Sequence, residues 1–117
     1  MDSGKTGKDF WGSCGWNFLH STAATYTPDN RRAYSAFLYD VIPRILPCSR
    51  CRENFKEKLK KIPPDTYLSN NHDLFYWTYV VHDLVNQATH KGPSPPYDVV
   101  KAAYFNALKS DCTDCNV

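Results

Sequence analysis

The chain has 117 residues, a length that one domain usually fills. Hydrophobic residues make up 42% and charged residues 22% of it, which is ordinary globular usage and argues against a disordered protein. The formal net charge of +2 argues against a nucleic-acid-binding protein that depends on a strongly basic surface. No apolar run approaches the roughly 18 residues of a membrane span. The start of the chain is rich in polar residues, so we expect no membrane span and no secretory signal.

Hydrophobic residues recur at helical spacing along nearly the whole chain. The expected helices cover residues 9–26, 30–46, 48–61, 72–90 and 97–109. Prolines separate them at Pro28, at Pro63 and Pro64, and between Pro93 and Pro96. No segment alternates as a strand would. The sequence therefore predicts an all-α fold, a four-helix bundle with a short fifth helix.

Each expected helix carries an apolar face. In the first, one stripe holds Phe10, Cys14, Phe18 and Ala24, and a second holds Trp16 and His20. In the others, the apolar faces comprise Tyr34, Phe37, Leu38, Val41, Ile42 and Ile45; Phe55, Leu59 and Ile62; Leu74, Trp77, Val81, Leu84, Val85 and Ala88; and Val100, Tyr104, Ala107 and Leu108.

Proline 43 lies inside the second expected helix. A proline lacks the backbone N–H that an interior helical position donates, and its ring crowds the preceding turn. We therefore expect Pro43 to kink this helix or to end it early.

Five cysteines form two CxxC pairs, Cys48–Cys51 and Cys112–Cys115, and leave a single Cys14. In a reducing compartment, such pairs are more often metal-binding or redox-catalytic than structural. Cys14 lies within an expected helix with apolar neighbours, so we expect a buried, inert thiol.

The first CxxC pair has the features of a redox centre. Pro47 precedes it, and Cys48 begins an expected helix, where the positive end of the helix dipole favours a thiolate. Arg50 and Arg52 add positive charge. Two cysteines in one helical turn can form a disulfide reversibly.

Two other interpretations of the pair remain open at this point. A structural zinc site would use both CxxC pairs, although the 60 residues between them exceed the usual spacing. A thioredoxin-like site would need a strand before Cys48, where the pattern is helical.

Polar and aromatic residues gather on two of the expected helices. His82 and Asn86 are four residues apart and share a helix face, and Trp16 and His20 repeat this arrangement on the first helix. A buried polar pair needs partners. These side chains are either a structural His–Asn pair or the binding site of a flat aromatic ligand with polar edges, such as a flavin.

Three motifs in this order resemble the Erv/ALR family of FAD-dependent sulfhydryl oxidases over residues 9–108. They are Trp11-Gly12-x-x-x-Trp16-x-x-Leu19-His20, then Leu46-Pro47-Cys48-x-x-Cys51, then Trp77-x-x-x-x-His82-Asp83-x-Val85-Asn86. The short chain and the Leu-Pro-Cys form are similar to compact members from large cytoplasmic DNA viruses.

The resemblance implies FAD held within the bundle, a homodimer, and a location in the cytoplasm, that of the host if the protein is viral. Electrons would pass from thiol substrates, or through a thioredoxin-like carrier, to a disulfide, to FAD and then to oxygen, giving hydrogen peroxide. Cys51 matches the flavin-proximal sulfur and Cys48 the interchange sulfur. The residues implied to contact the cofactor are Gly12, Trp16, His20, Cys51, His82, Asp83, Asn86, Lys91 and Tyr104. No metal site is implied.

The chain departs from the family pattern at three places. Asp83 stands where an asparagine is usual, and Ser13 stands where cellular members have an arginine. The two cysteines of the family's structural disulfide correspond to Tyr79 and roughly to Val99, so both are absent.

The expected domain covers residues 1–109, and residues 110–117 form an expected flexible tail. Cys112 and Cys115 in this tail match a second pair that passes electrons to the core disulfide in many family members. Alternatively, they are simple tail thiols or a tail disulfide. The rival functions are a zinc-stabilised helical interaction module and a disulfide carrier without a cofactor.

Overall fold

The computed structural model describes residues 6–109, and within them it contains helices and turns but no strand. The α-helices are α1 (Lys8–Ala24), α2 (Arg31–Ala36), α3 (Ile42–Ile45), α4 (Ser49–Lys61), α5 (Asn71–Ala88) and α6 (Tyr97–Ala107). Two 3₁₀ turns, η1 (Pro28–Asn30) and η3 (Pro64–Tyr67), and one π turn, η2 (Phe37–Val41), connect them. The expected all-α class is confirmed. The expected tail with Cys112 and Cys115 lies outside the described residues.

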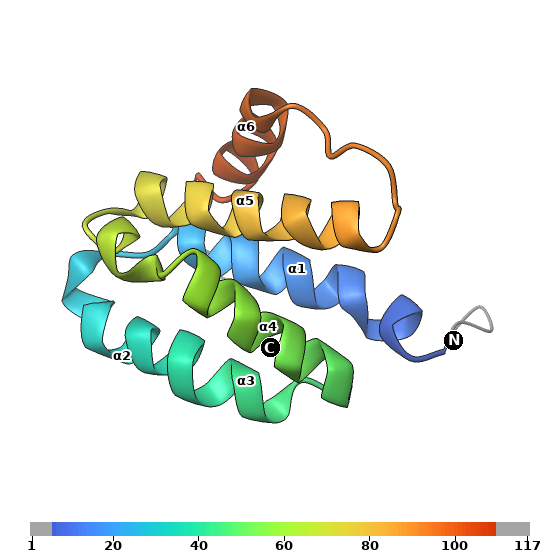
Figure 1. The fold of residues 1–117 in the computed structure, drawn as a ribbon. Helices are drawn as coiled ribbons and strands as arrows, with labels where there is room; N and C mark the ends of the chain where they lie inside the picture. Colours follow the sequence, from blue (N-terminus) through green and yellow to red (C-terminus); the bar gives the residue numbers. More distant parts are fainter. Residues whose placement is uncertain (1–5, 110–117) are drawn as a thin grey trace, which may run out of the picture.

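The helices form two pairs, with α6 packed on the outside of one of them (Figure 1). α1 and α5 run antiparallel and pack most extensively, and α4 lies beside the continuous stretch α2–η2–α3. The short α6 covers the first pair from outside. This is the expected four-helix bundle with a fifth helix, because α2, η2 and α3 follow one another without a break. Each described helix is too short or too polar to cross a lipid bilayer.

Proline 43 does not end its helix. Immediately before it, the backbone widens into a π turn over residues 37–41, and the N–H of Ile42 donates to the carbonyl of Phe37, five residues back. The helix then continues to Ile45. A wider turn is one way to accommodate a ring that would otherwise crowd the preceding carbonyls.

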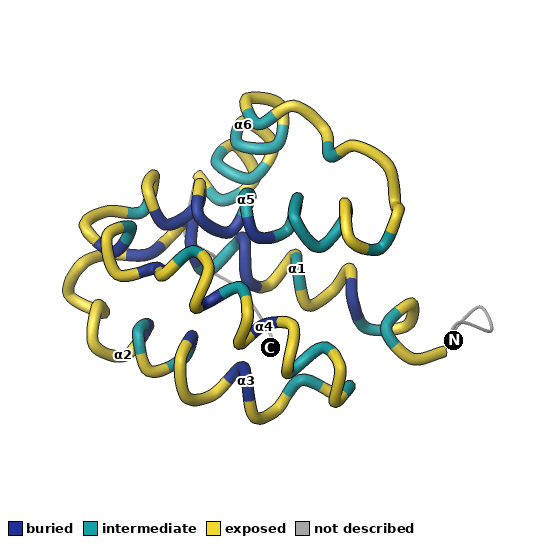
Figure 2. The backbone as a smooth tube through the Cα atoms, viewed as in Figure 1, coloured by how far each residue is buried: buried dark blue, intermediate teal, exposed yellow. Residues whose placement is uncertain are grey.

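The core lies between the two helix pairs (Figure 2). Leu38, Leu74, Phe75 and Trp77 are fully buried in it. The indole N–H of Trp77 donates to the carbonyl of Ile62 at 2.8 Å. Trp77 is therefore a structural residue that holds α5 to the end of α4.

The buried face of α1 is not its expected Phe10 stripe. Phe10 is 55% exposed, Phe18 is 63% exposed and Cys14 is also exposed. The expectation of a buried Cys14 thiol is therefore wrong. The buried residues of α1 are instead Gly12, Leu19, His20, Ala23 and Ala24, and of these only Ala24 belongs to the expected stripe. The small side chains of Ala23 and Ala24 let α1 and α5 approach closely, which bulky phenyl rings there would prevent.

The second expected apolar face is also only partly buried. Tyr34, Leu38 and Ile42 are buried, but Val41 is 40% exposed and Ile45 is 64% exposed. The π turn inserts an extra residue into the helical repeat, so residues that follow it rotate relative to the stripe that a regular helix would present.

Replacing Phe75 by Ala should lower the free energy of unfolding by about 3–5 kcal/mol, because the phenyl ring is fully buried. Replacing Phe18 by Ala should cost less than about 1 kcal/mol, because most of that side chain already contacts water. Urea denaturation of both variants measures the difference. Equal losses would contradict the assignment of the buried face.

Candidate functional site

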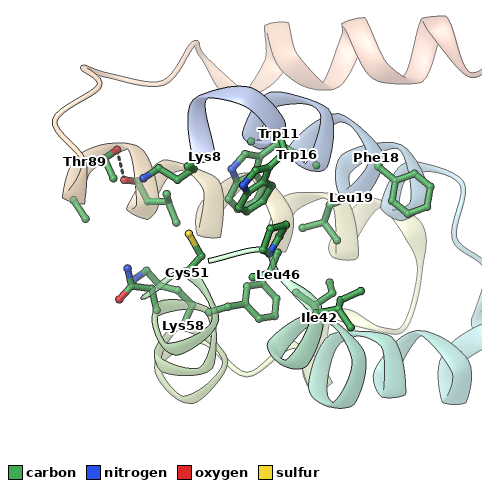
Figure 3. A pocket seen from close by; sticks show the side chains of 18 of the residues that line it. Lys8, Trp11, Trp16, Phe18, Leu19, Ile42, Leu46, Cys51, Lys58 and Thr89 are labelled. Atoms are coloured by element: carbon green, nitrogen blue, oxygen red, sulfur yellow. Dashed lines mark hydrogen bonds between the residues drawn. The ribbon is translucent and has the colours of Figure 1, made fainter. Parts of the chain in front are cut away.

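An apolar cavity of about 430 Å³ opens between α1, the end of α3, α4 and the end of α5. Figure 3 shows Trp11 and Trp16 entering it from α1, and Ile42, Leu46 and Cys51 from the opposite side. Further lining residues are Gly12, Gly15, Leu19, Phe37, Phe55, Val85 and Ala88. The cavity is therefore an apolar space with one sulfur in its wall, that of Cys51.

The two cysteines of the first CxxC differ in their surroundings. Cys51 lines the cavity, whereas Cys48 does not. Cys48 precedes the first turn of α4 as its N-cap, and its Sγ accepts a hydrogen bond from the backbone N–H of Cys51 at 3.1 Å. Both residues are half-buried thiols in this structure. The helix start thus presents one sulfur to the cavity and one away from it.

The surroundings of the two thiols shift their pKa values in opposite directions. Hydrogen bonds from the Cys51 thiol and the Cys51 backbone N–H lower the pKa of Cys48. Burial, followed by the hydrogen bond with Cys48, raises the pKa of Cys51. In the reduced pair the thiolate therefore resides on Cys48, as expected for a sulfur at a helix N-terminus.

Lys8 also belongs to this site, although no pattern in the sequence indicated it. It projects from the first turn of α1 toward the cavity that Cys51 also lines (Figure 3). Its ammonium charge lowers the pKa of both Cys48 and Cys51. A positive charge near both sulfurs favours their anionic forms. Only the tertiary structure, which places Lys8 and Cys51 at the same cavity, brings Lys8 to the cysteines, since 40 residues separate it from Cys48.

A second, polar cavity of about 260 Å³ adjoins the first. Lys8, Gly12, Trp16 and Val85 line both, so the two spaces share a wall. The other residues around the polar cavity are Ser13, Asn17, His82, Asn86, Lys91 and Tyr104. Most of the residues that the sequence predicts for a cofactor site are therefore brought together here.

A chain of hydrogen bonds connects the core with the polar cavity. The Thr78 hydroxyl donates to the Phe75 carbonyl at 2.7 Å, so its oxygen accepts from Nδ1 of His20 at 2.8 Å. Nε2 of His20 is then the acceptor for Nδ1–H of His82 at 2.9 Å. This order assigns both tautomers. It leaves Nε2 of His82 as an acceptor.

Burial keeps both histidines neutral. Desolvation, with the charge of His82 as a smaller cause, lowers the pKa of His20 to about 4. Desolvation and the charge of Lys91 lower the pKa of His82 to about 4. His20 lies behind the cavity wall and lines neither space. It therefore acts on the site by orienting His82.

Trp16 stacks on His82, with ring centroids 4.0 Å apart and an angle of 5° between the planes. The two rings are already in contact, so a flat ligand would stack on an outer face of this pair and not between its members. Tyr104 extends the aromatic wall from α6. Its ring meets His20 edge-on at 5.3 Å, and its hydroxyl donates to Oδ1 of Asn17 at 2.5 Å.

Asp83 lines neither cavity. Its carboxylate accepts from the Ser94 hydroxyl at 2.7 Å and from the Gln87 amide at 2.8 Å. The Asn86 amide donates to the same Ser94 oxygen at 3.2 Å. Asp83 therefore fixes the loop between α5 and α6, and through Ser94 it holds Asn86 in place.

The end of α5 places Lys91 at the polar cavity. The helix stops at Ala88, and His90 adopts a left-handed conformation with φ of 57°. The Lys91 N–H then donates to the Asn86 carbonyl at 3.0 Å, which closes the helix end. The expected helix to residue 90 is thus slightly too long, because the chain turns back here.

The histidine pair predicts a pH dependence of stability. As the pH falls from 6.5 toward 4, the unfolded chain binds protons that the folded chain does not, because folding lowers both pKa values. The free energy of unfolding should therefore fall over this range, by an amount on the order of 5 kcal/mol for the two groups together, reduced somewhat by solvent screening at the half-buried His82. Urea denaturation at a series of pH values measures it.

The matched control for that measurement is the double variant His20→Gln, His82→Gln. All carboxylates remain in it, so they contribute to both curves alike. We expect a shallower pH dependence in the double variant, and parallel curves would contradict the assignment of the two neutral histidines.

Replacing Lys8 by Met should raise the pKa of Cys48, because a nearby positive charge is lost. Lys8→Arg should retain the wild-type value. The ultraviolet absorbance of the thiolate, titrated in a background with Ser at positions 14, 112 and 115, reports the CxxC alone. An unchanged titration in Lys8→Met would show that the ammonium does not act on the sulfur.

Residues 6–109 contain no group of three His, Cys, Asp or Glu side chains that could hold a metal ion. The zinc interpretation needs Cys112 and Cys115 as well, and these lie beyond that range.

Comparison with known proteins gives three informative relatives. The chain is 36% identical over 86 residues to the probable FAD-linked sulfhydryl oxidase R368 of Acanthamoeba polyphaga mimivirus, covering 69% of this chain and 59% of that protein. It is 33% identical over 84 residues to the FAD-linked sulfhydryl oxidase of African swine fever virus, covering 69% of each chain. It is 32% identical over 111 residues to the FAD-linked sulfhydryl oxidase ERV1 of Oryza sativa subsp. japonica, covering 92% of this chain and 54% of that protein.

The chain thus spans between half and two thirds of the length of the mimivirus and rice relatives. The Erv1 / Alr family itself matches residues 13–104, a range that contains the first CxxC, the histidine pair and most of the residues that line the two cavities. The chain belongs to the Erv1 / Alr family.

Proposed function

We propose that the protein is an FAD-linked sulfhydryl oxidase. In this reaction two substrate thiols become a disulfide, and molecular oxygen takes up the two electrons and two protons to give hydrogen peroxide. The observation that carries the proposal is a CxxC whose second sulfur lines an apolar cavity, with a polar cavity directly beside it. The names of the relatives support the same activity. They do not support the zinc-stabilised module.

The chemistry of the two cavities fits FAD. A flavin ring is flat and largely apolar, and the cavity lined by Trp11 and Cys51 is also largely apolar. The remainder of the cofactor is polar and carries phosphates. Lys8 and Lys91 offer positive charge beside the polar cavity, and His82 offers an acceptor for a donor group of the cofactor. Bound FAD would accept two electrons from the reduced CxxC and deliver them to oxygen.

The residues of the chain divide the thiol chemistry between them. A substrate thiolate attacks Sγ of Cys48, the Cys48–Cys51 bond breaks, and Cys51 departs as the thiolate. The second substrate thiolate then attacks the mixed disulfide and releases Cys48. Lys8 stabilises the sulfur anions formed in both steps. Trp16, His82 and Asn86 bind and orient the cofactor.

Cys112 and Cys115 are proposed as a shuttle for bulky substrates. A dithiol tethered near the core disulfide has an effective concentration that reaches about millimolar for a short linker. Such a pair would collect electrons from a protein that cannot approach Cys48 directly. The homodimer and the cytoplasmic location implied by the resemblance remain predictions.

Replacing Cys51 by Ser should leave the protein yellow but lower thiol oxidation by at least about 100-fold, because no other described cysteine lines the apolar cavity. The visible spectrum measures bound FAD, and its bleaching by anaerobic dithiothreitol measures electron entry. Cys14→Ser is the matched control and should behave as the wild type, since Cys14 lies on the exposed face of α1. A colourless wild-type protein, or an active Cys51→Ser variant, would refute the proposed function.

Removing residues 111–117 should spare the oxidation of dithiothreitol and slow that of a reduced protein substrate several-fold, because only the bulky substrate needs the tethered dithiol. Oxygen consumption with each substrate gives both rates. Cys112→Ser, Cys115→Ser in the full chain should reproduce the truncation. Unchanged rates with both substrates would exclude the shuttle, and loss of both would indicate a structural tail.

A further inference from the structure

The surface around Cys48 is formed by two helix ends. The last turn of α3 contributes Arg44 and Ile45, and the first turn of α4 contributes Arg50, with Pro47 between them. All four side chains are exposed, and Ile45 is 64% exposed. Cys48 does not line the apolar cavity and is flanked in the chain by these exposed residues, so this surface is open to a substrate sulfur that approaches it.

Arginines outnumber acidic residues around this surface. Residues 41–52 contain three arginines, Arg44, Arg50 and Arg52, and no Asp or Glu, although the exposed Asp40 directly precedes them. The Arg52 guanidinium donates to the Leu46 carbonyl, which holds it under the turn that precedes Cys48. Glu53, the next acidic residue, is paired with Lys56 at 3.3 Å.

Two further positive groups lie near the Cys48 sulfur, the Lys8 ammonium and the N-terminus of α4. The Lys8 ammonium approaches from α1 closely enough to affect the acidity of both sulfurs. The N-terminus of α4 adds the positive end of its dipole, which the Cys48 sulfur meets through the Cys51 N–H. The positive charges therefore come from three separate elements, α1, α3 and α4.

A positive surface of this kind attracts negatively charged partners and speeds their encounter. Guanidinium groups bind carboxylates in a two-pronged geometry, and two exposed arginines could each hold one. The same charges stabilise the thiolate that the arriving substrate must present. A small neutral thiol would benefit only from the stabilisation of its thiolate.

We infer that the arginine rim formed by Arg44 and Arg50 selects peptide or protein thiols that are flanked by Asp or Glu. The inference rests on the proposed oxidase activity and names the substrate class for its outer cysteine. The chemical step is unchanged. The acidic substrate loses two electrons as its disulfide forms through Cys48, the CxxC gains them, and oxygen receives them through FAD.

The test compares two synthetic dithiol peptides that differ only in the residues flanking a CxxC, Asp in one and Lys in the other. Oxygen consumption by the FAD-loaded enzyme gives kcat/KM for each. The intrinsic reactivity of each peptide toward a small neutral disulfide corrects for the different acidities of their thiols. At low salt the Asp peptide should be favoured by about 10-fold, and the preference should shrink in about 0.5 M salt, where charges are screened within a few ångströms.

The variant Arg44→Glu, Arg50→Glu should reverse the preference between the peptides. The ratio of the two kcat/KM values is the readout, so a general change in activity does not affect the conclusion. Arg32→Glu is the matched control. This exposed arginine lies 12 residues from Arg44 along the same helical stretch, or about 18 Å, and its replacement should preserve the wild-type ratio.

Equal use of both peptides, a preference that salt does not change, or the same ratio in the double variant would overturn this inference while leaving the oxidase activity in place. Failure of the wild type to bind FAD or to oxidise dithiothreitol would instead refute the proposed function.

Discussion

The contact between α1 and α5 is the constraint on which the rest of the structure depends. At its centre, the Phe75 carbonyl, Thr78, His20 and His82 form one hydrogen-bonded chain from the core to the polar cavity. Each polar group in this hydrogen-bonded series has the next one as its partner. Burying the two imidazoles therefore costs little free energy as long as both are neutral. The chain also fixes the tautomer of His82 and the position of Trp16, which stacks on it.

The second constraint is the loop between α5 and α6, which shapes the far side of the polar cavity. Here the positions of the family's structural disulfide are occupied by Tyr79 and, roughly, Val99. The Tyr79 hydroxyl donates to the Pro95 carbonyl at 2.6 Å, and its ring packs edge-on against Tyr97 at 5.1 Å. With the Ser94–Asp83 hydrogen bond, these contacts hold the loop to α5 without a covalent link. Because these contacts involve no thiol, the attachment of the loop to α5 does not depend on redox conditions.

The division of labour between the two CxxC sulfurs follows from where α4 begins. Cys48 is the N-cap and does not line the apolar cavity, whereas Cys51, the third residue of the helix, does. Hydrogen bonds from Cys51 and from the Arg50 backbone, together with the charge of Lys8, favour an anion at Cys48. The arrangement suits a pair in which one sulfur exchanges with an external thiol while the other communicates with an enclosed cofactor.

Much of this protein could be predicted from its sequence, because helical periodicity, proline breaks and the CxxC spacing are local signals. They predicted the all-α class and the approximate helix bounds, while the resemblance to the Erv/ALR family implied most of the residues that gather at the polar cavity. Local patterns did not predict which stripe of α1 is buried, because Phe10 and Leu19 are both apolar and only the packing against α5 favours the side with Leu19 and Ala23. Nor did they indicate Lys8, whose effect on the cysteines requires α1 and α4 to line the same cavity. The sequence by itself determined the elements and the reactive groups. Only the tertiary structure decided their neighbours, because burial, charge proximity and tautomers depend on residues that are distant along the chain.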